Sequence, residues 1–324
     1  MLPEWAETTT IQDCHILYGG FNPVWVSGKF ERHVVDTLAK HLGNRTAIVV
    51  PTWYDPIDVV EYINTLDVDQ VYIGSLTDPF GPILGFVDQI KCPVKFFGYT
   101  DQGIKFDFWA VVCAENFKQY TEHDLQPTQF KFLYLNYNRK PHVHRTKFVE
   151  QLEINDLVHA GCVTLGNSKY SITEDDSYAT WGANDVVDLD SIAIPNDIYS
   201  LGRLDIWNQS FINIVSETEF TSHSCFLSEK TFKPIIGLRP FIINGNPNIY
   251  NWLQQAGFDC FADLFPVDKI INCTNTAQAH DLIIDCLKFY QDKDWASIYK
   301  SIYPRLLKNK EHFNEYSRNN TINS

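Results

Sequence analysis

Residues 211–246, FINIVSETEFTSHSCFLSEKTFKPIIGLRPFIINGN, decide how this chain folds. Residues 211–215 form a short apolar run rich in β-branched side chains, which predicts a buried strand. Residues 228–237 predict a helix, with Ser228 as its N-cap and a glycine as its C-terminal stop. Residues 240–243 predict a second buried strand, which the loop sequence Asn-Gly-Asn-Pro closes. A strand, a helix and a strand in this order favour a parallel sheet.

The start of this predicted helix carries the chemistry. A helix N-terminus presents unpaired N–H groups and partial positive charge, which suit a phosphate. Lys230 and Lys233 lie on roughly one face of the helix and would add full positive charges. Glu229 is an acceptor suited to two neighbouring hydroxyl groups, such as those of a ribose. The pattern predicts a site for a nucleoside diphosphate; the alternative is an amphipathic surface helix with solvated charges.

A second concentration of positive charge follows a strand predicted at residues 130–135. The next ten residues, NYNRKPHVHR, include five basic or histidine side chains in a chain of net charge −14. Cations are disfavoured at a helix start, and a helix is predicted to begin here, so the cluster favours an anion site; the alternative is a solvated charge cluster. The position of Arg139 permits a contact with such an anion, and we expect His142 and His144 to face solvent.

Both stretches resemble the donor-binding segments of GT-B glycosyltransferases, most closely those of the α1,3-fucosyltransferase type and related bacterial and phage enzymes. In that family a strand of the FNI-A-FEN kind precedes the motif Y-[IV]-T-E-K-x-x-x-A-x-x-x-G-x-x-P-[IV]-[IV]. The donor domain opens with a strand ending in S-N, a loop and R-x-x-F-x-x-x-L. The matching positions here are Asn136, Arg145, Phe148, Leu152, Glu217, Phe226, Ser228, Glu229, Lys230, Gly237, Pro240, Ile242 and Ile243.

The resemblance implies a role for each matching polar residue. Glu229 would hold the donor ribose, Lys230 a donor phosphate, and Arg145 the diphosphate. Phe226 stands where the family usually has Tyr, so its ring would stack on a base without a hydroxyl contact. The further donor contacts that we expect, in the motif or in the loop after it, are Glu217, Phe226, Ser228, Lys233 and Asn246.

The first part of the chain predicts strands that alternate with helices. This alternation favours a doubly wound open α/β sheet, whose ligands lie where the strands end. An inverting glycosyltransferase needs a base, and the candidates are Asp78 and Asp55, which follow predicted strands. The alternative is that each carboxylate caps its own loop. The predicted strands are residues 11–18, 47–50, 71–74, 94–97 and 109–113, and the predicted helices are residues 27–42, 57–66 and 114–120.

The length of 324 residues suggests two domains. A polar segment at residues 122–129 is the expected linker. We therefore expect a Rossmann-like, acceptor-side domain over residues 1–125 and a donor-binding domain over residues 126–324. The resemblance implies that the two domains face a cleft, as in the GT-B fold, and that the last predicted helix, residues 295–313, crosses back. The second domain also includes predicted strands at residues 161–165 and 258–261 and predicted helices at residues 145–152, 248–256 and 277–290.

Composition limits the other classes of function. The net charge of −14 and the pI near 5.1 argue against a protein that grips duplex DNA. The eight cysteines have no C-x-x-C pair and no zinc-ligand spacing, which indicates free thiols in a reducing compartment. The acidic N-terminus is no signal peptide, and no apolar run has membrane-spanning length, so we expect a cytoplasmic protein.

The expected reaction is transfer of a sugar from a nucleoside-diphosphate sugar to an acceptor hydroxyl, with a glycan as the acceptor. No cofactor and no metal are expected, because Lys and Arg would replace a metal at the phosphates. A D-x-D sequence at residues 188–190 carries little weight among so many acidic residues. Two alternatives stay open: a DNA glycosyltransferase acting on hydroxymethylated bases, and a non-catalytic nucleotide-binding scaffold of the same fold.

Overall fold

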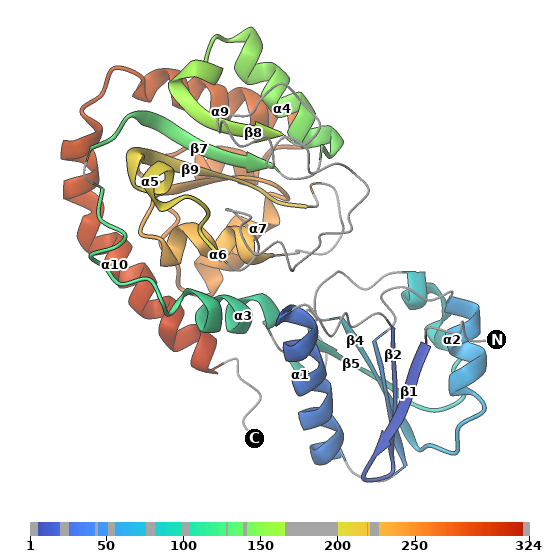
Figure 1. Cartoon of the computed structure of the whole chain (residues 1–324). Helices are drawn as coiled ribbons and strands as arrows, with labels where there is room; N and C mark the ends of the chain where they lie inside the picture. The colour runs from blue at the N-terminus through green and yellow to red at the C-terminus, as the bar shows by residue number, and fades with distance from the viewer. Residues whose placement is uncertain are drawn as a thin grey trace. The chain divides into compact units, whose positions relative to one another are not determined.

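The protein is an α/β structure with two sheets, each in its own compact unit (Figure 1). One unit is Met1–Val112 with Tyr316–Ser324, and the other is Cys113–Glu315. The domain limits expected from the sequence stay a prediction. The computed structural model describes residues 6–19, 26–42, 45–50, 56–75, 82–98, 104–105, 107–127, 129–138, 141–165, 200–218, 220 and 227–319.

The first unit has a six-stranded sheet in the order β1-β2-β3-β4-β5-β6. β1 pairs antiparallel with β2, and the other neighbours pair in parallel. Its apolar core includes Leu17, Val49 and Ile73, which share one face of the sheet because their strands pair in register. The strands are β1 (Ala6–Ile11), β2 (Cys14–Gly19), β3 (Thr46–Val50), β4 (Gln70–Ser75), β5 (Val94–Gly98) and β6 (Ile104–Lys105), and the helices are α1 (Val26–Leu42), α2 (Pro56–Ile63) and the 3₁₀ helix η1 (Pro82–Gln89).

Two predictions for this unit need correction. The strand predicted at residues 11–18 begins too early. Gln12 and Asp13, with φ values of 48° and 61°, form the turn of a hairpin, so Ile11 ends β1 and the second strand of the hairpin is β2. The strand predicted at residues 109–113 is wrong: these residues lie in helix α3 (Phe108–Phe117). An apolar run without alternation fits a buried helix as well as a buried strand.

The second unit has a four-stranded, wholly parallel sheet in the order β10-β9-β7-β8. From β7 the chain crosses to β8 on one side, and from β9 it crosses to β10 on the other. Since such crossovers are right-handed, the connecting helices α4 and α6 cover opposite faces of the sheet, as Figure 1 shows. The strands are β7 (Phe132–Asn138), β8 (Gly161–Leu165), β9 (Ser210–Ser216) and β10 (Phe241–Asn244).

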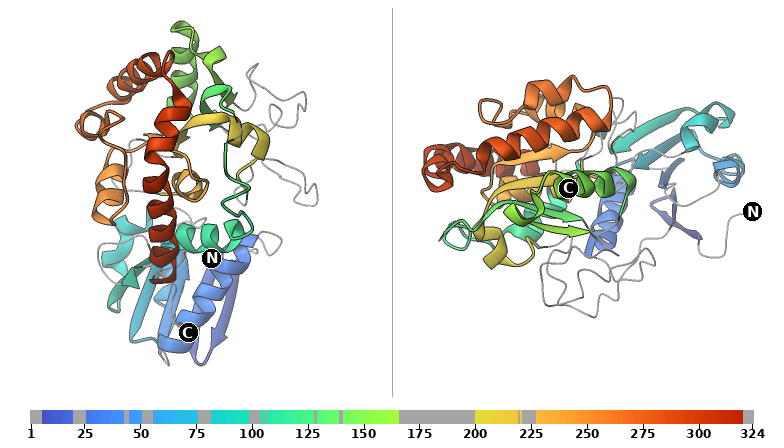
Figure 2. Two further views of the ribbon diagram at one scale, coloured as in Figure 1. Left: turned by 90° about the vertical axis from the view of Figure 1, so that its left-hand side faces the viewer. Right: turned by 90° about the horizontal axis from the view of Figure 1, so that it is seen from above.

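The helices of this unit agree with the sequence pattern except in a few places. α5 and α8 were not predicted, and the strand predicted at residues 258–261 is wrong: these residues are irregular, and Phe261 has a φ of 57°, which an extended strand excludes. None of the described helices is long and apolar enough to cross a membrane. The helices are α4 (Val143–Ile154), the 3₁₀ helix η2 (Val158–Ala160), α5 (Leu204–Gln209), α6 (Glu229–Ile236), α7 (Asn248–Gln255), α8 (Val267–Ile271), α9 (Thr276–Tyr290) and α10 (Trp295–Asn319), which is red in Figure 2.

The polar segment before β7 is packed into the second unit rather than lying free as a linker. Leu125 is fully buried, and its carbonyl accepts a hydrogen bond of 3.0 Å from Arg239. The guanidinium of Arg239 is itself buried and also donates to the carbonyls of Leu238 and Trp207, at 2.8 and 3.2 Å. Burial lowers the pKa of Arg239 to about 10. One buried cation therefore ties this segment to the end of α6.

Candidate functional site

The strand order of the second sheet defines a topological switch point between β7 and β9. The connections that leave these two strands run in opposite directions, so α4 and α6 diverge beyond their carboxyl ends. In open α/β sheets, ligands bind in the crevice that diverging connections leave. The residues at these two strand ends and at the two helix starts are therefore the candidate site.

Ser228 begins α6 as the sequence predicted. Its side-chain oxygen accepts a hydrogen bond from the backbone N–H of Lys230 at 3.3 Å, which is the geometry of an N-cap. The helix ends at Ile236, directly before Gly237, the predicted stop. The predicted helix at residues 228–237 is confirmed, with Ser228 as its N-cap and Gly237 as its C-cap.

Glu217 directly follows β9, and its side chain is fully buried. One carboxylate oxygen accepts hydrogen bonds from the backbone N–H of Ser228 (3.1 Å) and the hydroxyl of Thr231 (2.6 Å). The other accepts from the hydroxyl of Ser228 (2.6 Å) and the backbone N–H of Thr218 (3.3 Å). The dipole of α6 also favours a negative charge at this end. The geometry supports Glu217 as the anchor of α6, and its expected contact with the donor stays a prediction.

Glu229 and Lys230 form an ion pair in the first turn of α6, with 3.1 Å between Oε1 and Nζ. The side chain of Glu229 is only 5% exposed, whereas that of Lys230 is 27% exposed. Burial raises the pKa of the Glu229 carboxyl. The charges of Lys230 and Lys233 lower this pKa by more than burial raises it, so the net shift is downward. Lys233 is buried. Lys230 is thus the cation of this helix start that reaches the surface.

Arg145 and His144, in the first turn of α4, bind the same backbone oxygen. Arg145 Nε donates to the carbonyl of Glu217 at 3.3 Å, and His144 Nε2 donates to it at 2.9 Å. The prediction that His144 faces solvent is wrong, because its ring is half-buried, and this burial lowers its pKa. Glu217 therefore holds α6 with its carboxylate and α4 with its carbonyl. It brings Arg145 and Lys230, predicted from separate motifs, to one switch point.

Buried amide side chains form a continuous chain across the same edge of the sheet. Asn138 Nδ2 donates to Asn136 Oδ1 at 2.6 Å, and Asn136 Nδ2 donates to Ser216 Oγ at 3.0 Å. Asn244 Nδ2 also donates to Ser216 Oγ, at 3.3 Å, while Asn244 Oδ1 accepts from His280 Nε2 at 3.0 Å. We call these five residues the amide seam. Sequence reasoning missed its continuity, although asparagines at the carboxyl ends of two predicted strands were a usable signal.

One acceptor of the amide seam is left over. Asn138 Oδ1 is buried and has no hydrogen-bond partner among the residues that the structure describes. A buried acceptor without a partner costs about 1–3 kcal/mol. Asn138 is the last residue of β7, so this unused acceptor lies at the switch point itself.

A pocket of about 850 Å³ adjoins the seam, where α4 and α9 begin. Basic side chains line it, including Lys147 and His142, with His280 of the seam. Two carboxylates, Glu150 and Asp281, lie among its walls as well. The first residues of both helices contribute to the lining, and helix starts favour an anion. Burial, reinforced by the charges of His144 and Lys147, lowers the pKa of His280 to about 4, so its ring is neutral at pH 7.

Asn246 is buried after β10, and its Oδ1 accepts from the backbone N–H of Asn248 at 3.0 Å. Among the described residues, no group of three or more His, Cys, Asp or Glu side chains could hold a metal ion. The expected residues that lie outside the described part of the chain, and so stay predictions, are Asp55, Asp78, Arg139 and Phe226.

No protein-family model matches the chain, and neither a curated protein nor a solved structure matches it. Function is therefore inferred from the site alone.

Proposed function

We propose that this chain is a GT-B glycosyltransferase that moves a sugar from a nucleoside-diphosphate sugar to an acceptor hydroxyl. The observation that carries the proposal is the meeting of Arg145 and Lys230 at one switch point. Each lies in the first turn of a helix, and the two helices diverge from neighbouring strand ends. Two cations at diverging helix starts are what a diphosphate requires.

The chemistry follows from the charge that develops during transfer. When the acceptor oxygen displaces the nucleoside diphosphate, negative charge grows on the departing phosphate oxygens. Arg145 and Lys230 would stabilise that charge, and groups held in place before the reaction do so most effectively. Glu229 would accept hydrogen bonds from the ribose hydroxyls. The adjoining pocket of about 850 Å³ lies within the range of about 300–1,000 Å³ that small-molecule sites occupy.

The GT-B arrangement is part of this proposal. It is supported by two units that each hold a largely parallel sheet. It is also supported by the assignment of Tyr316–Ser324 to the first unit, where Tyr316 Oη donates to Asp107 Oδ2 at 3.0 Å. Asp78 or Asp55 would be the base that takes the acceptor's proton. A glycan is the expected acceptor, since the net charge of −14 disfavours DNA.

A non-catalytic nucleotide-binding scaffold is the second candidate, and one observation favours it. Lys230 already pairs with the carboxylate of Glu229, at 3.1 Å, so the lysine that would stabilise the departing phosphate is partly neutralised, which counts against the transfer step more than against binding. A scaffold of this kind would bind a nucleotide and leave the bond between sugar and phosphate intact.

Thermal unfolding against a panel of nucleoside diphosphates and their sugars tests the site. A ligand at 100 times its Kd adds about 2.7 kcal/mol to the free energy of unfolding. We expect one nucleotide to raise Tm, and Lys230→Ala to weaken its binding about tenfold or more. Lys269→Ala removes an exposed lysine of the same unit and is the matched control. Its response to the nucleotide should equal that of the wild type.

The release of nucleoside diphosphate from the matching sugar nucleotide separates the two candidates. Release that depends on Lys230 supports the glycosyltransferase. Binding without release, across a range of glycan acceptors, supports the scaffold. A panel in which no nucleotide changes Tm would overturn both candidates, because each requires a nucleotide at this switch point.

A further inference from the structure

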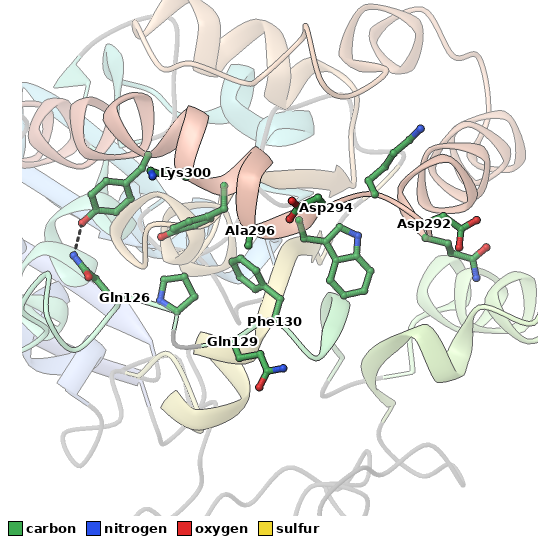
Figure 3. A pocket seen from close by; sticks show the side chains of 13 residues that line it. Gln126, Gln129, Phe130, Asp292, Asp294, Ala296 and Lys300 are labelled. Atoms are coloured by element: carbon green, nitrogen blue, oxygen red, sulfur yellow. Dashed lines mark hydrogen bonds between the residues drawn. The ribbon is translucent and has the colours of Figure 1, made fainter.

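A second pocket, of about 790 Å³, lies near the amino end of β7, in the same unit. Phe130, which lines it, precedes the first residue of β7, whereas the amide seam lies at the carboxyl ends of the strands. Figure 3 shows Gln126 and Lys300 at one end of this pocket and Asp292 at the other, with Phe130 and Ala296 between them. We call it the aromatic pocket.

Packing holds the rings of the aromatic pocket in place. Phe130 meets Tyr299 edge to face, with 5.3 Å between ring centroids, and meets the core residue Phe211 at 5.7 Å. Trp295 stacks parallel to Phe211 at 6.5 Å, and its indole N–H donates to the carbonyl of Tyr290 at 2.6 Å. Tyr303 lies 5.8 Å from Tyr299, and its hydroxyl accepts from Gln126 at 3.2 Å. The ligand would therefore meet rigid apolar faces, which lowers the entropic cost of binding.

The rim of the pocket is polar and balanced in charge. Two acidic and two basic residues line it, namely Asp292, Asp294, Lys293 and Lys300. Asp294 accepts hydrogen bonds from Ser297, and the Lys293 ammonium lies over the Phe289 ring. The side chains of Gln129, Gln291 and Asp292 make no hydrogen bond with other described residues, so their donors and acceptors remain for a ligand. A balanced rim selects neither an anion nor a cation, which argues against a nucleotide or a phosphate here.

We propose that the aromatic pocket binds neutral sugar rings of a glycan. A pyranose has an apolar face, which packs on aromatic rings, and hydroxyl groups, which pair with amides and carboxylates around it. The volume exceeds what a single ring fills, so an oligosaccharide is the expected ligand. The proposal is independent of the glycosyltransferase, because it concerns binding near the amino end of β7 and requires no nucleotide.

Saturation-transfer NMR with neutral oligosaccharides, and no nucleotide present, tests this site. We expect saturation of the sugar ring protons by the wild type. Tyr303→Leu removes an aromatic face and should weaken binding about tenfold, whereas Tyr303→Phe keeps the ring and should stay within about threefold. Asp292→Ala removes an exposed acceptor that makes no hydrogen bond within the described part of the chain, and it should weaken binding by a similar factor, with Tm unchanged.

Matched controls distinguish the pocket from other surfaces and from the switch point. Asp285→Ala and Gln255→Ala change exposed residues of the same unit outside the pocket and should leave sugar binding unchanged. Lys230→Ala should also leave it unchanged. The proposal is overturned if no neutral oligosaccharide receives saturation. It is equally overturned if Lys230→Ala abolishes the signal while the aromatic-pocket variants keep it, or if only an apolar peptide, and no sugar, binds.

Discussion

Glu217 shows at the residue scale how one residue can hold the starts of two helices in place. Its carboxylate accepts four hydrogen bonds from Thr218, Ser228 and Thr231, and its carbonyl accepts two from the start of α4. A buried carboxylate is costly unless its oxygens are satisfied and a positive end of a helix lies close by. Both conditions hold here, so the residue's contribution to folding can be measured apart from any activity.

Glu217→Gln tests this anchoring role. The amide presents an NH₂ group where the carboxylate accepts from Thr231 or Ser228, and at least one buried donor then loses its partner. We expect a loss of about 2–3 kcal/mol in the free energy of unfolding. Urea denaturation at pH 7 measures it, with Glu311→Gln, an exposed residue of α10, as the control. Equal midpoints for the two variants would contradict the anchoring role.

His280 makes the stability of the protein depend on pH. Its folded-state pKa, lowered to about 4, lies below the ordinary value of 6.5. Between these values the unfolded chain binds the proton and the folded protein does not. The stabilisation is therefore complete above pH 6.5 and is lost as the pH falls toward 4, by up to about 3 kcal/mol.

The measurement for His280 is urea unfolding from pH 7 down to pH 4.5. His280→Gln should flatten the dependence, since Gln has no proton to gain, while it can still donate to Asn244. His123→Gln changes an exposed histidine and should retain the wild-type slope. If the free energy of unfolding of His280→Gln depends on pH as steeply as that of the wild type, other groups cause the dependence and the prediction is wrong.

At the scale of elements, α6 is placed by a close approach at its end. A Cβ on Gly237 would come within 2.4 Å of Trp207 Cζ2 and 2.8 Å of the carbonyl of Lys233. Trp207 also donates its indole N–H to the carbonyl of Gly237, at 2.9 Å. Glycine is therefore required at this position, because only a residue without a side chain lets the end of α6 pack against Trp207 of α5.

Gly237→Ala should lower the free energy of unfolding by about 2 kcal/mol or more, because the buried tryptophan cannot yield without opening the core. The backbone φ of Gly237 is −80°, so an alanine would suffer from the clash and not from the conformation. Gly85→Ala is the matched control, since nothing lies within 4 Å of its added Cβ. Thermal melts of the two variants compare them directly. Equal Tm values would refute the close approach as the cause.

At the scale of the whole molecule, the proposed activity depends on charges supplied by the protein. In the proposed function Arg145 and Lys230 would contact the phosphates, so we expect removal of divalent cations to leave nucleotide binding unchanged. Thermal stabilisation by the best nucleoside diphosphate, with excess EDTA and with added Mg²⁺, measures this. A stabilisation that disappears with EDTA and returns with Mg²⁺ would show that a metal bridges the phosphates.

Most elements could be predicted because their signals are local. The run before Ser216, the cap at Ser228 and the glycine at 237 each act within a few residues, so β9 and α6 were placed within one or two residues. The strand predicted at residues 109–113 failed because an apolar run has no period of its own. The hairpin at Gln12 was missed because its turn lacks the usual glycine or asparagine.

The sequence by itself determined the alternation of strands and helices, the N-cap at Ser228 and the two stretches that hold Arg145 and Lys230. These depend on hydrogen bonds and side-chain periods within a single element. Only the tertiary structure decided that Glu217 faces inward, that His144 is half-buried and that the amide seam runs from Asn138 to His280. Those features depend on strand order, and strand order is set by which apolar faces pack together across the whole unit. No local pattern in the chain encodes it.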